Sequence, residues 1–172
     1  QSLFPDNAYG FESGGDPDNI PDLAYEDFIE FHKKYYHPSN SYIYLYGDMD
    51  IEEKLLWMDR YYLRFFDEMF VDSAIPMQKA FDKVRYDEDF YSAQNEDDKA
   101  YYSYNFVIDS SCNKELLVAF QVLTYALVLV PGAPLKKALV DAGVGEDISA
   151  SFDNDLMQSV FSIMASEAPV DK

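Results

Sequence analysis

The chain has two histidines, and these are the first residues to test for metal or acid–base chemistry. His32 and His37 are five positions apart, which on a helix of about 3.6 residues per turn places them on different faces. Pro38 follows the second histidine and disfavours helix there. A zinc site in a protein needs about three convergent ligands. The pair therefore predicts a structural role for both residues, with incidental metal binding at the surface as the alternative.

One glycine-containing loop and two carboxylate runs could be mistaken for ion-binding motifs. The loop at residues 13–16, Ser-Gly-Gly-Asp, lacks the G-x-x-x-x-G-K-[ST] spacing of a phosphate loop, and Glu12 and Asp16 would repel a phosphate. The carboxylate runs at 87–89 and 96–98 lack the D-x-[DN]-x-[DN]-G pattern of a calcium loop. We interpret residues 13–16 as a structural loop and the two carboxylate runs as solvated turns.

The remaining candidate for chemistry is a nucleophile at Ser110-Ser111-Cys112. This stretch has no G-x-S-x-G pattern and no obvious histidine partner, so Cys112 is interpreted as a small apolar residue near a helix start. The sequence thus predicts no catalytic residue, no cofactor-binding residue and no metal ligand in this chain.

Hydrophobic spacing predicts two helices around a strand in the first half of the chain. Residues 1–21 hold too many Pro and Gly for a regular element. A helix should then begin near Asp22, carry a buried apolar stripe and end before Pro38. Ala24 offers no side-chain cap, so Asp22 is the expected replacement. Residues 42–46 predict a buried strand, and Asp50 should cap a second helix that runs to about residue 66.

In the second half, the pattern predicts two strands, two helices and a hairpin. Residues 84–93 and 101–109 should pair antiparallel across a polar turn at 94–99. Asn113 should cap a helix over 114–130, which is apolar nearly all round and so should be enclosed by other elements. Pro134 should open a helix that ends at Gly143. The hairpin should join residues 148–152 and 160–164.

Composition limits the partners that the chain can have. The formal net charge is −19, which argues against nucleic acid and anionic membrane surfaces and makes cationic ligands the better electrostatic match. Apolar residues make up 48% of the chain and aromatic residues 17%, so a packed core is expected. The longest apolar run is shorter than the roughly 20 residues of a membrane helix. A single cysteine is compatible with a reducing compartment.

Several segments together resemble one peptidase family. They are residues 3–10 (LFPDNAYG), 13–17 (SGGDP), 31–48 (FHKKYYHPSNSYIYLYGD), 134–139 (PLKKAL), 143–145 (GVG) and 155–161 (DLMQSVF). The chain resembles the insulinase/pitrilysin family of inverted-motif (inverzincin) zinc metallopeptidases, in its presequence-protease-like branch. It departs from the family at Ala24, where relatives usually have Thr, and at Ala133, where Ser is common.

The resemblance implies an architecture and a domain division. The fold class is α/β of the α+β two-layer kind, built from parts of two metallopeptidase-type domains, each an antiparallel-rich sheet backed by helices. Residues 1–70 would be the C-terminal part of the first domain, 71–83 a linker, and 84–172 the N-terminal half of the second, with the order ββααββ.

The resemblance also implies a function for the parent protein but not for this chain alone. Members carry an H-x-x-E-H helix and a third ligand, a Glu, that hold zinc. This sequence contains no H-x-x-E-H motif, and the resemblance implies that the third ligand lies upstream of the Leu-Phe-Pro segment at residues 3–5. We therefore expect a non-catalytic internal fragment, inactive alone, of a zinc-dependent enzyme that degrades unfolded peptides in a closed chamber. The fragment itself would hold no cofactor. Its compartment would be the bacterial cytoplasm, or an organelle in a eukaryote.

Two further expectations concern partners. The alternative function is a stand-alone acidic α/β module that binds a cationic or extended peptide by strand addition. Either way, a truncated sheet and uncovered helix faces favour self-association of the fragment through sheet edges or the 114–130 helix.

Overall fold

The computed structural model describes residues 1–94 and 100–170, which form two compact units. Unit 1 consists of Gln1–Phe11 and Ile75–Lys172, and unit 2 of Glu12–Ala74. Each unit is described by itself. The expected domain limits, 1–70 and 84–172 with a linker at 71–83, stay a prediction.

Unit 2 contains two helices joined by irregular chain. Helix α1 spans Tyr25–Tyr35 and α2 spans Ile51–Tyr61, and single 3-10 turns lie at Ile20–Asp22, Pro38–Asn40 and Leu63–Phe65. At α2 the predicted cap is confirmed, because Asp50 Oδ1 accepts a hydrogen bond from the Glu53 N–H at 3.0 Å. At α1 the predicted cap is wrong. Ala24 is the N-cap without a side-chain bond, and Asp22 lies in the preceding 3-10 turn.

The strand predicted at residues 42–46 is also wrong. The structure places these residues in irregular chain, and Tyr42, Tyr44 and Tyr46 are largely exposed. A strand is held by backbone hydrogen bonds to a neighbouring strand, and the described residues of unit 2 contain no strand. The same lack of a sheet explains why neither α1 nor α2 has a buried residue, although both carry the apolar stripes that the sequence analysis expected to be buried.

Unit 1 is built on a three-stranded antiparallel sheet in the order β1-β3-β2. Strand β1 spans Ala100–Ser110, β2 spans Asp147–Asp153 and β3 spans Gln158–Ala168. The predicted hairpin of β2 and β3 is confirmed. Phe161 of β3 lies opposite Phe106 on β1 and Phe152 on β2, so directly paired aromatic residues form a row across one face.

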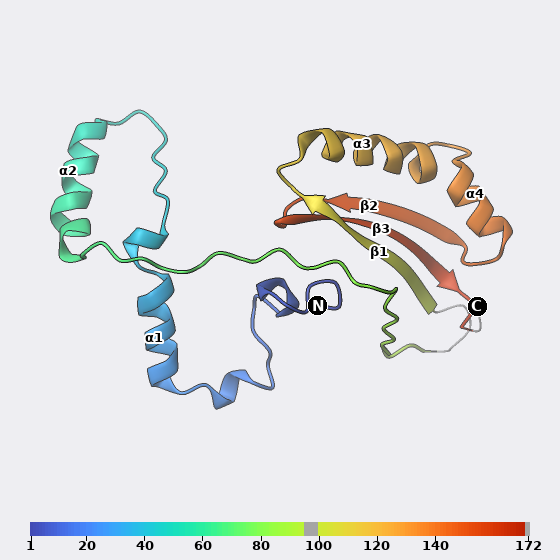
Figure 1. Cartoon of the computed structure of the whole chain (residues 1–172), viewed down its shortest axis with the longest axis horizontal. Helices are drawn as coiled ribbons and strands as arrows, with labels where there is room; N and C mark the ends of the chain where they lie inside the picture. The colour runs from blue at the N-terminus through green and yellow to red at the C-terminus, as the bar shows by residue number, and fades with distance from the viewer. Residues whose placement is uncertain (95–99, 171–172) are drawn as a thin grey trace. The chain divides into compact units, whose positions relative to one another are not determined.

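Helices cover that face (Figure 1). Helix α3 spans Lys114–Thr124 and continues as a π-helical turn over Tyr125–Leu129; α4 spans Pro134–Asp141. Phe120 of α3 contacts two rings of the aromatic row, with centroids 5.3 Å from Phe152 and 5.5 Å from Phe161. Further along, Val128, Ile148 and Ala165 form the buried core with residues of α4 around them. Helices on an antiparallel sheet confirm the α+β class.

Local signals place the ends of both helices as predicted. Asn113 Oδ1 accepts from the Leu116 N–H at 3.2 Å and so caps α3. Pro134 opens α4 at its first position. After α4, Gly143 has φ +66°, a left-handed conformation that glycine adopts without strain and that ends the helix.

Two predictions for unit 1 are wrong. Residues 84–93 form no strand: their backbone takes part in none of the sheet's two strand pairings, and strand propensity without a ladder partner does not make a strand. Most of the predicted turn at 94–99 lies outside the described residues. The helix over 114–130 was expected to be enclosed, but only one side of it is buried. Val118, Val122, Tyr125 and Leu129 remain exposed on the other side.

The junction of β1 and α3 is held by a carboxylate. Asp109 Oδ1 accepts from the Ser110 N–H at 2.7 Å, and Oδ2 accepts from Asn113 Nδ2 at 3.2 Å. These bonds, the Ser110 amide first, lower the pKa of Asp109, because both favour the ionised form. The carboxylate therefore orients the residue that caps α3.

This arrangement predicts an acid-dependent contribution of Asp109 to stability. Since its pKa is lowered in the folded chain, the contribution is fully present above the ordinary carboxyl pKa and is lost as pH falls through the lowered one. Urea midpoints measured from about pH 5 downward should fall more steeply for the wild type than for Asp109→Asn. Glu146→Gln, which removes a carboxylate elsewhere in unit 1, should keep the wild-type slope. Equal slopes for all three proteins would contradict the role of Asp109.

No single helix within residues 1–94 and 100–170 is both long enough and apolar enough to cross a membrane. One pair, Lys114–Leu129 with Pro134–Asp141, reaches the length and composition only when counted together across a bend of 41°.

Candidate functional site

The two histidines occupy separate local structures in unit 2. The His32 ring stacks on Tyr36 with centroids 4.7 Å apart. His37 Nδ1 accepts from the Ser39 N–H at 3.2 Å, which caps the 3-10 turn, and its ring meets the edge of Phe66 at 5.3 Å. The structure therefore gives each histidine a structural contact of its own and does not bring the two together.

The other clusters singled out in the sequence have local contacts. The Asp16 carboxylate accepts from the Asp18 N–H at 2.9 Å and from Asn19 Nδ2 at 2.7 Å, as in a structural loop. Cys112 is an exposed free cysteine directly before the cap of α3. Residues 87–89 are exposed, and the run at 96–98 lies outside the described residues.

A metal centre would need several ligating side chains close together. Within residues 1–94 and 100–170, no three His, Cys, Asp or Glu side chains come together as ligands of a metal ion would. The described residues thus do not fit a zinc site, which needs about three such ligands.

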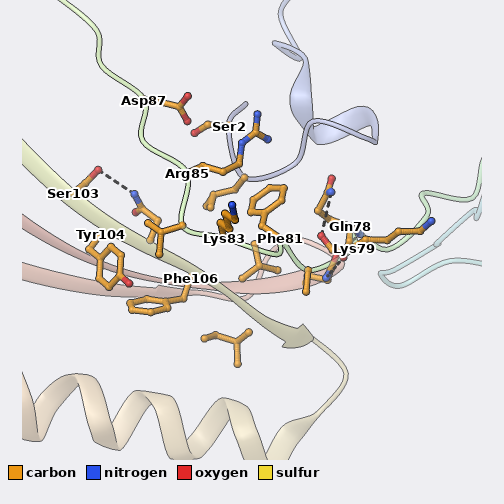
Figure 2. A pocket seen from close by; sticks show the side chains of 17 residues that line it. Ser2, Gln78, Lys79, Phe81, Lys83, Arg85, Asp87, Ser103, Tyr104 and Phe106 are labelled. Atoms are coloured by element: carbon orange, nitrogen blue, oxygen red, sulfur yellow. Dashed lines mark hydrogen bonds between the residues drawn. The ribbon is translucent and has the colours of Figure 1, made fainter.

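The candidate site is instead a hollow of about 470 Å³ in unit 1. One wall is the irregular segment from Gln78 to Asp87, and the other is strand β1 (Figure 2). Its volume lies within the range of small-ligand pockets. The complete lining is Ser2, Leu3, Gln78, Lys79, Ala80, Phe81, Lys83, Val84, Arg85, Asp87, Ser103, Tyr104, Asn105, Phe106, Val107, Ile108 and Gln158.

The contribution of β1 shows that the hollow runs along a strand edge. Six consecutive residues of β1, 103–108, line it. Successive side chains of a strand point to opposite faces, and Figure 2 shows Tyr104 and Phe106 on the side of α3 and Ser103 on the other. A lining that takes residues from both faces includes the edge between them. β1 is also the terminal strand of the sheet, so this edge carries no ladder among the described strands.

The opposite wall carries most of the charge. Lys79, Lys83 and Arg85 all line the hollow, against one carboxylate, Asp87. The Arg85 guanidinium lies over the Phe81 ring at 4.9 Å from its centroid, a contact that fixes the direction of a long side chain. None of the ion pairs between described residues uses these three cations.

Two buried glutamines hold this wall in place. Gln158, the first residue of β3, accepts from the Gln78 N–H through Oε1 at 2.6 Å and donates through Nε2 to the Gln78 carbonyl at 3.1 Å. Gln78 in turn accepts from the Asp6 N–H at 3.0 Å and donates to Asp6 Oδ2 at 2.6 Å. Each glutamine is 7% exposed. We call this pair the glutamine clasp; it ties the segment 76–80 to the sheet.

The N-terminal residues of unit 1 are joined to the rest of that unit in the same region. Asn7 Nδ2 donates to the Pro76 carbonyl at 3.1 Å, and the Tyr9 hydroxyl accepts from the Met157 N–H at 3.1 Å. The clasp is not predictable from local sequence, because glutamine has no strong preference for burial and the partners are 80 positions apart. An isolated Gln at the start of a strand is only a weak indication of a buried polar contact, and hydrophobic periodicity does not detect it.

Comparison with known proteins places the chain in a family. A family model described as "Peptidase M16 inactive domain" matches residues 22–171. The chain is 47% identical over 175 residues to "Protein HypA" of Clostridium perfringens (strain 13 / Type A), which covers 100% of this chain and 18% of that protein. It is 35% identical over 169 residues to "Presequence protease 1, chloroplastic/mitochondrial" of Arabidopsis thaliana, covering 95% and 16%. To "Presequence protease, mitochondrial" of Xenopus laevis it is 31% identical over 171 residues, covering 94% and 16%.

These matches extend over nearly the whole chain but over 16–18% of the relatives. The family match includes the sheet of unit 1 with its helices α3 and α4, together with most of unit 2. The resemblance seen in the sequence is thereby confirmed. The chain belongs to the peptidase M16 family, in its presequence-protease-like branch.

Proposed function

We propose that this chain is a non-catalytic internal part of a zinc-dependent metalloendopeptidase that degrades unfolded peptides in a closed chamber. The observation that carries the proposal is the match of residues 22–171 to a domain described as inactive, together with relatives named presequence proteases. The sequence contains no H-x-x-E-H motif, which agrees with a non-catalytic role.

In this proposal the chain is a scaffold and wall of the peptide chamber. The aromatic row and the core under α3 and α4 make unit 1 a two-layer support. Zinc would be held elsewhere in the parent protein, since the described residues here do not fit it. The protein would work in the cytoplasm of a bacterium, or in an organelle if its source is a eukaryote.

The proposal predicts that the isolated chain neither retains zinc nor cleaves peptides. After loading with zinc and dialysis, metal analysis should find far less than one equivalent per chain, because His32 and His37 do not converge. A fluorogenic unfolded peptide should remain intact when zinc is present. The matched control is the double variant His32→Ala/His37→Ala, which should behave like the wild type. One tightly held equivalent that this variant loses would refute the proposal.

The second candidate function is a stand-alone peptide-binding module. The observation in its favour is the hollow along the open edge of β1, where an extended peptide could add a strand. The coding sequence separates the two candidates. An H-x-x-E-H motif encoded upstream in the same reading frame supports the fragment, and its absence supports the module.

A further inference from the structure

We propose that the open edge of β1, at residues 103–108, binds an acidic peptide segment in extended conformation. The segment would add a strand to the sheet, and its carboxylates would pair with Lys79, Lys83 and Arg85. This inference goes beyond the proposed function, because it assigns a ligand class to a site that the family match does not describe.

The backbone geometry supplies the first half of the argument. β1 pairs with β3 along one edge only, so alternate N–H and C=O groups on its other edge have no ladder partner among the described strands. Such an edge is a template for another extended chain. Val84, Arg85 and Asp87 line the hollow together with β1, and residues 84–93 do not join the ladder. The hollow between this wall and β1 is where the extended segment would lie.

Charge selects the occupant. The chain as a whole has 13 basic and 32 acidic residues, so a random surface of this protein would be acidic. The hollow reverses that ratio, with three cations and one carboxylate, all on exposed side chains. An acidic peptide is therefore attracted to this edge and repelled by most of the remaining surface.

The sheet's opposite edge provides an internal comparison. Strand β2 also lies at an edge, but it begins and ends with Asp147 and Asp153. Backbone pairing alone would make the two edges equivalent. Charge makes β1 the edge for an acidic segment, and this difference can be measured.

The experiment uses the 172-residue chain and a labelled probe peptide of about eight residues, the length of an ordinary strand, that alternates Glu and Val. Fluorescence anisotropy should show binding that weakens as salt is raised. A peptide with Lys in place of Glu should bind at least about tenfold more weakly. A version of the acidic peptide with N-methylated central amides should lose binding, because it cannot pair with the strand. Amide shifts measured by NMR should map to residues 103–108 and not to β2.

A charge-reversal variant completes the test. Lys83→Glu/Arg85→Glu should weaken binding of the acidic peptide by about tenfold or more. Lys33→Glu/Lys34→Glu changes the net charge equally in unit 2 and should bind like the wild type; circular dichroism checks that both variants fold. Failure of the acidic peptide to bind would overturn the proposal. That is also the result expected if residues 84–93 pair with β1 and close its edge. Equal binding by the two variants, equal binding of the methylated peptide, or shifts at β2 would overturn it as well.

Discussion

Replacing Gln158 with alanine is expected to lower the free energy of unfolding of unit 1 by about 2–4 kcal/mol. Gln158 satisfies both backbone groups of Gln78, at 2.6 and 3.1 Å, in surroundings where each residue is only 7% exposed. The alanine variant leaves a buried N–H and a buried C=O without partners. An unpaired buried polar group costs about 1–3 kcal/mol, so two of them account for the expected loss.

The matched control is Gln121→Ala on the exposed side of α3, where alanine is also a better helix former. That variant should be as stable as the wild type. A second variant, Gln78→Ala, removes the bonds to Asp6 but keeps the backbone groups that Gln158 binds, and it should cost less than Gln158→Ala.

Hydrogen exchange is the suitable measurement, because the single Trp57 lies in α2 of unit 2 and does not report on the sheet. In Gln158→Ala, the amides of residues 77–80 should lose protection first, and those of the strands should follow. If Gln158→Ala exchanged like Gln121→Ala, the clasp would contribute nothing to the stability of unit 1.

The second large effect is expected in the oligomeric state. We propose that the isolated chain self-associates through the exposed side of α3 and its π-helical turn. Val118, Val122, Tyr125 and Leu129 recur at helical spacing, which places them on one side, and their side chains are 54%, 64%, 59% and 54% exposed. Sheet-edge association through residues 42–46 or 84–93, the other predicted route, loses its basis because neither segment is a strand.

Charge repulsion opposes the association of two copies of the chain, and burial of apolar surface favours it. The net charge of −19 repels a second copy, but salt screens exposed charges over about 10 Å at 0.1 M. Removing apolar surface from water contributes roughly 25 cal/mol per Å² at contact. The π-helical turn and α3 together carry only Lys114 and Glu115 as charged residues, so local repulsion is small. Apolar contact between two copies should therefore outweigh their charge repulsion at moderate salt.

Sedimentation velocity at high concentration and moderate salt should therefore show a dimer or larger species for the wild type. Val118→Gln/Val122→Gln, which changes no charge, should shift the chain to monomer. Ile51→Gln, at a similarly exposed site on α2 (51%), should leave the association unchanged. A wild-type monomer, or association lost in Ile51→Gln alone, would show that α3 is not the interface.

The sequence by itself determined those features whose causes lie within a few residues. Asp50 and Asn113 cap helices through bonds to amides three positions on, and Pro134 and Gly143 mark the ends of α4. The hairpin of β2 and β3 needed only two apolar strands around a polar turn. Motif-length segments also sufficed to show the family, which the match over residues 22–171 confirmed.

Only the tertiary structure decided which segments are strands and which stripes are buried. Residues 42–46 and 84–93 have strand composition, but a strand exists only where a neighbour supplies ladder bonds, and these segments have none among the described residues. The stripes of α1 and α2 stay exposed because unit 2 has no sheet to cover them. The clasp joins residues 80 positions apart, and the three cations line the same hollow as β1 although they lie well outside that strand in the sequence. Such contacts depend on the path of the whole backbone, which local spacing does not encode.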